Sequence, residues 1–130
     1  MNAPLLTANL ALTVLFLVAT VLSGIRGKRR AHYALVVVTI VMLLMAIAQA
    51  ELFGRGYTFD PLRLNVHLGF AFTALGCLPG AIWSGMSLRT NPVRRQAHRF
   101  LIWSFVILTV LAVLTALWML LSAVPLADSA

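Results

Sequence analysis

The sequence predicts an all-α integral membrane protein, a four-helix bundle whose helices run up, down, up and down. Hydrophobic residues make up 62% of the 130 residues and charged residues only 10%, and the mean hydropathy is +0.98. A chain of this composition has too little polar surface to coat a water-soluble domain of its size. We therefore expect lipid to be its main solvent.

Four long runs contain no Asp, Glu, Lys or Arg, namely residues 1–25, 31–50, 64–88 and 100–127. A helix of roughly 20 residues crosses a hydrocarbon core of about 30 Å, because each residue rises about 1.5 Å. The runs are continuously apolar, whereas the strands of a membrane barrel alternate in polarity. The predicted helices cover approximately residues 4–25, 32–53, 63–88 and 97–123 of a single transmembrane domain, residues 1–130.

The connections between these helices are short, so we expect neighbouring helices to be antiparallel. They leave no room for a soluble catalytic domain, and no phosphate-binding glycine loop or nucleophile with a plausible base is present. No internal repeat is evident. We therefore expect no independent catalytic activity.

The distribution of basic residues predicts the orientation in the membrane. The first and third connections carry eight of them, and the middle connection carries two. Those of the first are Arg26, Lys28, Arg29 and Arg30, those of the third are Arg89, Arg94, Arg95 and Arg99, and those of the middle are Arg55 and Arg63. The positive-inside rule then places both termini outside the cytoplasm. Because the basic residues lie at the ends of the spans, anionic lipid headgroups explain the net charge of +7 better than nucleic acid does.

Three histidines open the second, third and fourth predicted helices: His32, His67 and His98. In this topology His32 and His98 begin parallel helices at the cytoplasmic side, where they are candidates to share one ligand. A b-type haem with two axial imidazoles is one candidate, and copper and a quinone headgroup are others. Cations for haem propionates are available at Arg29, Arg30, Arg94, Arg95 and Arg99. The alternative is that each histidine only anchors its helix at the interface.

A second polar layer is predicted at the outer side, about 28 Å away by the helical rise. Glu51 ends the second helix there and His67 opens the third. An ionisable residue in a span is a functional candidate unless it is paired or hydrated. Glu51 and His67 are candidates for a metal site, and the alternatives are a hydrogen bond between them or an ion pair of Glu51 with Arg55 or Arg63.

The placement of these residues resembles a known family. The segments that carry the resemblance are Asn9 in the first helix, the basic turn 27–32, the histidine segment 65–69 and the basic turn 94–99. They resemble the small four-helix bacterial membrane proteins of domain of unknown function 420, which include a factor needed to make haem-A-type cytochrome c oxidase active. Members typically carry a further histidine near the end of the second helix, where this chain has Gln49 and Glu51 instead.

The resemblance implies a multi-pass protein of the bacterial inner membrane that serves respiratory electron transfer or terminal-oxidase maturation. The preferred hypothesis is that His32 and His98 hold a b-type haem or metal. A non-catalytic accessory subunit of a larger respiratory or photosynthetic complex is the first alternative, which predicts other membrane subunits as partners. A small proton or solute transporter that depends on Glu51 is the second.

Overall fold

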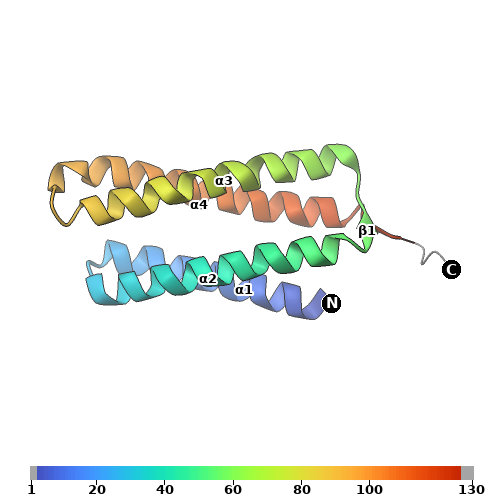
Figure 1. Cartoon of the computed structure of the whole chain (residues 1–130), viewed down its shortest axis with the longest axis horizontal. Coiled ribbons are helices and arrows are strands. Elements are labelled where there is room, and N and C mark those ends of the chain that lie inside the picture. Colours follow the sequence, from blue (N-terminus) through green and yellow to red (C-terminus); the bar gives the residue numbers. More distant parts are fainter. Residues whose placement is uncertain (1–2, 127–130) are drawn as a thin grey trace. The chain divides into compact units, whose positions relative to one another are not determined.

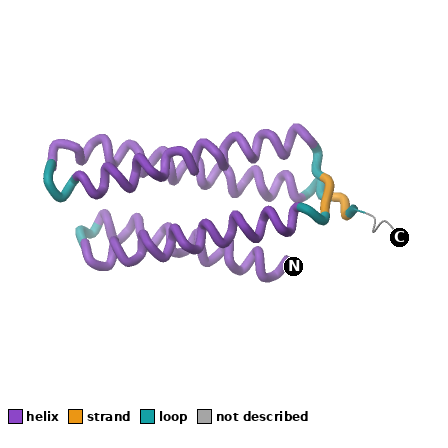
Figure 2. The backbone as a smooth tube through the Cα atoms, in the orientation of Figure 1, coloured by secondary structure: helices purple, strands orange, loops and turns teal. Residues whose placement is uncertain are grey.

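The structure, a computed structural model, describes residues 3–126 as four long helices with short connections (Figures 1 and 2). The elements are α1 (Ala3–Ile25), α2 (Arg29–Gly54), β1 (Tyr57–Thr58), α3 (Pro61–Ser87), the 3-10 turn η1 (Pro92–Arg94), α4 (Arg95–Leu120) and β2 (Val124–Pro125). All four α-helices are long and apolar enough to cross a membrane. This confirms the prediction of an all-α chain with four helices of membrane-spanning length.

The observed helices begin earlier than the sequence predicted, α2 by three residues and α3 and α4 by two. For α3 the reason is that capping, and not the edge of the apolar run, fixes the helix start. At the start of α3 the Asp60 carboxylate accepts a hydrogen bond of 3.0 Å from the Arg63 amide, and Pro61 occupies the first turn. Both features satisfy or remove donors that the helix itself cannot pair.

The described chain divides into two compact units, residues 3–57 with 125–126, and residues 58–124. The first unit is a hairpin of α1 and α2, and the second is a hairpin of α3 and α4 (Figure 1). Within each hairpin the two helices are antiparallel, as expected from the short connections.

A glycine turn joins α1 to α2. Gly27 has a φ of 67°, and the amide of Lys28 donates to the carbonyl of Ser23 over 3.0 Å while the amide of Gly27 donates to that of Gly24 over 3.1 Å. This pair of bonds is the Schellman motif, which pairs the last carbonyls of a helix and reverses the chain. It ends α1 a few residues after Ser23 and brings α2 back along it.

Small polar side chains fill the core of the first hairpin. The Thr20 and Thr39 hydroxyls are 2.8 Å apart, and the Asn9 amide donates to Gln49 Oε1 over 2.9 Å. The buried residues are Asn9, Thr13, Thr20, Ser23, Thr39 and Ala46. Short side chains of this kind allow close approach of helices in a membrane, where their hydroxyls and amides bond across the interface.

The core of the second hairpin is less polar. Its buried residues are Ala74, Ala81, Ser84, Phe105 and Ala112. A Cβ at Gly80 would lie 3.6 Å from both terminal methyl groups of Leu101, which is ordinary van der Waals contact.

The two short strands form a two-stranded ladder. The amide of Leu126 donates to the carbonyl of Gly56 over 3.0 Å, and the Thr58 hydroxyl donates to the carbonyl of Val124 over 3.3 Å. These bonds pair backbone groups that lie outside the helices.

The Asn9–Gln49 bond provides a first prediction. Asn9→Ala removes the donor and leaves the Gln49 oxygen without it in an apolar interface, so a double-mutant cycle with Gln49→Ala should give a coupling free energy of about 0.6 to 1.7 kcal/mol. Unfolding of the purified protein in mixed micelles measures it. Thr73→Val is the matched control, because the Thr73 hydroxyl is exposed and bonds within its own helix. A coupling of zero would contradict the bond.

Candidate functional site

His32 is held by the helix that precedes it in the first hairpin. Its Nδ1 lies 2.9 Å from the carbonyl oxygen of Thr20 and 3.3 Å from Ser23 Oγ. A carbonyl oxygen only accepts, so Nδ1 must carry the proton of the imidazole. The Ser23 hydroxyl itself donates to the same Thr20 carbonyl over 2.8 Å.

His98 also bonds through Nδ1 to the helix that precedes it, in the second hairpin. Its Nδ1 lies 2.9 Å from Ser84 Oγ, and Ser84 Oγ lies 3.0 Å from the carbonyl oxygen of Ala81. When the serine hydroxyl donates to Ala81, its oxygen accepts from the histidine, and the ring carries its proton on Nδ1, as in His32.

This tautomer determines what each ring can do chemically. A neutral imidazole protonated on Nδ1 has its lone pair on Nε2, the atom that ligates metals and haem iron. Histidine ligands almost always donate their other ring N–H to a carbonyl or another acceptor, which orients the ring. The hydrogen bond of His32 to the Thr20 carbonyl is of this type, and Ser84 Oγ is the corresponding partner of His98.

The surroundings of His32 form a small pocket of about 70 Å³ at the turn of the first hairpin. The neighbouring Tyr33 ring lies with its centroid 6.1 Å from that of His32. The lining residues are Ser23, Gly24, Gly27, Arg29, His32 and Tyr33. The pocket thus brings one of the predicted arginines to the predicted histidine.

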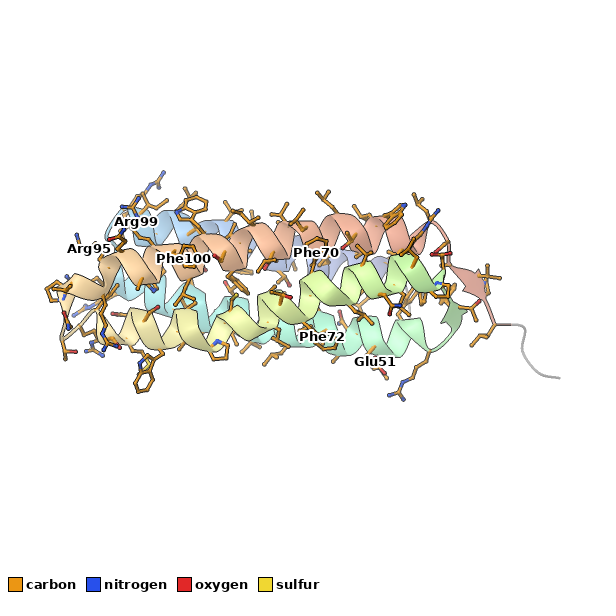
Figure 3. The ribbon with its side chains drawn as sticks, turned by 90° about the horizontal axis from the view of Figure 1, so that it is seen from above. Glu51, Phe70, Phe72, Arg95, Arg99 and Phe100 are labelled. Atoms are coloured by element: carbon orange, nitrogen blue, oxygen red, sulfur yellow. The ribbon has the colours of Figure 1, made fainter. Side chains whose placement is uncertain are left out.

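The predicted arginines are all exposed and lie in or beside the first turns of the two helices that carry His32 and His98. They are Arg29 and Arg30 in α2, and Arg94, Arg95 and Arg99 at the start of α4. Figure 3 shows Arg95 and Arg99 near the turn between α3 and α4, with their side chains directed away from the helix. Such side chains are available to anionic groups, whether headgroup phosphates or carboxylates.

The predicted outer residues each have a partner in their own hairpin. His67 Nδ1 lies 3.0 Å from the carbonyl oxygen of Ala112 on α4, so this ring too is protonated on Nδ1. Glu51 Oε1 lies 3.5 Å from Arg55 Nη2 one turn later, and the Glu51 side chain is 69% exposed. Of the alternatives for Glu51, the structure forms the pair with Arg55. Among residues 3–126 no three His, Cys, Asp or Glu side chains gather as a metal cluster.

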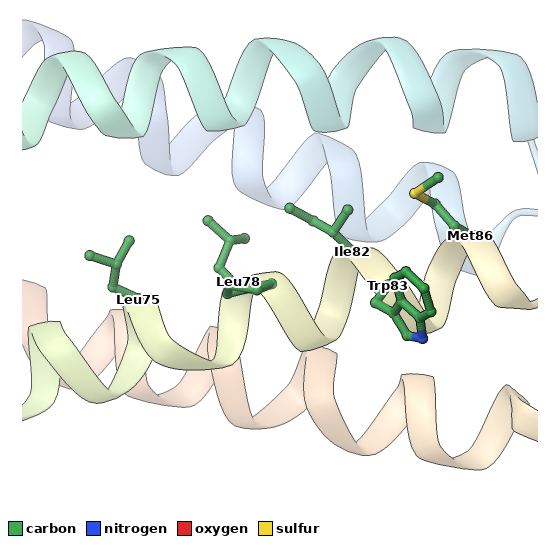
Figure 4. A pocket seen from close by; sticks show the side chains of 6 residues that line it. Leu75, Leu78, Ile82, Trp83 and Met86 are labelled. Atoms are coloured by element: carbon green, nitrogen blue, oxygen red, sulfur yellow. The ribbon is translucent and has the colours of Figure 1, made fainter.

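An apolar groove of about 400 Å³ lies along α3 (Figure 4). Its lining residues are Leu75, Leu78, Pro79, Ile82, Trp83 and Met86. Such side chains offer apolar contacts suited to a lipid chain, and none of the predicted site residues lines the groove.

Sequence reasoning selected the histidines but missed the residues that hold them. Ser23 and Ser84 lie nine and fourteen residues before their histidines, beyond any helical spacing that a pattern search would use. A signal was nevertheless present, because a Ser-Gly pair lies in the last turn of the helix before each of the two basic turns.

The exposure of Glu51 gives a second prediction. Glu51→Gln should change the free energy of unfolding by less than about 0.5 kcal/mol, since exposed ion pairs contribute little, and should leave proton flux in proteoliposomes unchanged. Asn9→Ala, measured in the same micelles, provides the comparison with a buried polar contact. A loss of flux would return weight to the transporter hypothesis.

Comparison with known proteins adds no relative. No family model, no curated protein and no solved structure matches the chain. The resemblance to domain of unknown function 420 therefore stays a prediction.

Proposed function

We propose that this chain is a small integral protein of the bacterial inner membrane that holds a b-type haem through His32 and His98. It serves electron transfer or the maturation of a terminal oxidase. The observation that carries the proposal is that both rings are held through Nδ1 within their own hairpins, which makes Nε2 the candidate ligand atom. Copper accepts the same donor atom and is the alternative ligand.

The predicted topology assigns both histidines to one side of the membrane. For four spans in an up-down-up-down order, the positive-inside rule assigns the basic turns to the cytoplasm and both termini to the opposite side. Both histidines then belong to the cytoplasmic side of the membrane, each in the first turns of a helix that follows a basic connection.

The exposed arginines supply the second requirement of a haem site. When bound, a b-type haem supplies one-electron transfer at its iron. Arg29, Arg30, Arg94, Arg95 and Arg99 offer cations for its propionates and favour the reduced state, which carries more negative charge. We therefore expect them to raise the reduction potential.

The test is an oxidised-minus-reduced visible spectrum of the detergent-purified protein, before and after incubation with haemin. We expect a b-type signal that is lost in His32→Ala and in His98→Ala, because each removes one of the two imidazoles that would hold the haem. His67→Ala is the matched control and should retain the signal. Absence of a Soret band, together with no uptake of haemin or Cu²⁺, would overturn the proposal.

A second candidate is an accessory subunit of a larger membrane complex. It is favoured by how few residues of the spans are buried. In an apolar 18-residue window of each span only 11 to 17% of the residues are buried, which leaves most of the helical surface for lipid or for other subunits. Purification in a mild detergent should then recover the chain with large partners. Recovery only as a monomer or homodimer would contradict this candidate.

A further inference from the structure

The two hairpins share a sequence signature that surrounds their basic turns. In the first hairpin Ser23–Gly24 precedes the turn and Ala31–His32 follows it; in the second, Ser84–Gly85 precedes and Ala97–His98 follows. The Ser-Gly pairs are 61 residues apart and the Ala-His pairs 66. A search at one fixed period finds no repeat, because the second turn is five residues longer.

The buried positions of the two hairpins correspond at the same two offsets. At an offset of 61 residues, Ala74, Ala81 and Ser84 match Thr13, Thr20 and Ser23, and at an offset of 66, Phe105 and Ala112 match Thr39 and Ala46. Every buried residue of the described second hairpin thus falls on a buried residue of the first. The buried positions correspond on both helices of each hairpin, so the register between the helices is the same. A regular spacing of residues along one helix does not by itself produce this agreement.

The glycine of each pair makes room for the imidazole. A Cβ built on Gly24 would lie 3.1 Å from both Cε1 and Nδ1 of His32, and one built on Gly85 would lie 3.0 Å from Cε1 of His98. Contacts of 3.0 to 3.1 Å are tighter than nearly all Cβ contacts, so a side chain at either position requires the ring to move by a few tenths of an ångström. At Gly76 and Gly69 an added Cβ would meet nothing within 4 Å.

We infer that the chain contains two copies of one ligand-presenting hairpin, in which a Ser-Gly seat fixes a histidine in its Nδ1–H tautomer. Nδ1 of His32 meets the Thr20 carbonyl and Ser23 Oγ, Nδ1 of His98 meets Ser84 Oγ, and the glycine admits the ring edge. Ser23, Gly24, Ser84 and Gly85 are thus positioning residues for an imidazole Nε2 that binds haem iron or copper. The ligand class rests on the proposed function, whereas the seat and the tautomer stand without it.

The seat holds the ring in either charge state. Nδ1 carries its proton in the neutral imidazole and in the imidazolium alike, so protonation at Nε2 leaves the bonds to Thr20 and Ser84 in place. His67 shows the same tautomer without a Ser-Gly seat, since its Nδ1 donates directly to the carbonyl of Ala112. It therefore serves as an internal reference.

The test is nitrogen NMR of the ligand-free protein labelled with ¹⁵N-histidine, because protonated and unprotonated ring nitrogens have well-separated shifts. We expect three neutral rings with the proton on Nδ1. Ser84→Ala and Gly85→Ala should each change the His98 signals and leave those of His32 and His67 unchanged. Gly24→Ala should change the His32 signals alone.

Two matched controls accompany these variants. Ser87→Ala removes an exposed hydroxyl that donates to the carbonyl of Trp83, and Gly76→Ala adds a methyl group into open space. Neither should alter any histidine signal. If Gly85→Ala fails to fold, Ser84→Ala alone still decides, because alanine is well tolerated in a helix.

The outcomes separate this inference from the proposed function. An Nε2–H tautomer at His32 or His98, or unchanged His98 signals in Ser84→Ala, would overturn the seat. Haemin titration of the same variants should show a loss of affinity of about 10- to 100-fold for Ser84→Ala, as is usual when the acceptor behind a histidine ligand is removed. A confirmed seat in a protein that binds neither haemin nor Cu²⁺ would overturn the ligand role alone.

Discussion

In helices long and apolar enough to cross a membrane, polar side chains need hydrogen-bond partners within the protein, and Nδ1 of each histidine has one in its own hairpin. The same constraint shapes the rest of the described chain. Backbone groups pair along four helices, and threonine hydroxyls donate to carbonyls one turn earlier, as Thr109 does to Phe105. In the described part of the chain no buried side-chain nitrogen or oxygen lacks a hydrogen-bond partner. In such a setting, the choice of acceptor decides which tautomer a histidine adopts.

The four helices were predictable because length and apolar composition suffice to identify a membrane-spanning segment. The residues at which the helices start were less predictable, because Asp60 and Pro61 begin α3 outside the apolar run. The histidines were predictable as polar residues at helix starts. The serines that hold them were not, because the contact between Ser84 and His98 depends on how two helices pair across a turn, which spacing along one helix does not specify.

A histidine ring that is held in place and an exposed arginine side chain contribute differently to a binding site. The ring of His32 is held at Nδ1 by a carbonyl and a serine, with Gly24 close against the Nδ1–Cε1 edge, so it loses little further freedom when Nε2 binds a ligand. The arginines are exposed and keep that freedom, which suits them to meet a flexible carboxylate or a lipid phosphate. A preorganised imidazole ligand surrounded by flexible arginine side chains is favourable for holding a rigid, apolar cofactor that carries propionates, such as the proposed haem.

The two hairpins differ in the residues that form their cores. Thr13, Thr20 and Thr39 in the first correspond to Ala74, Ala81 and Phe105 in the second, so a polar core has an apolar counterpart at matched positions. Yet serine, glycine and histidine are identical at both turns. Residues that stay the same while the core around them changes answer to a requirement other than packing, and presentation of Nε2 is the chemical property that the two seats have in common.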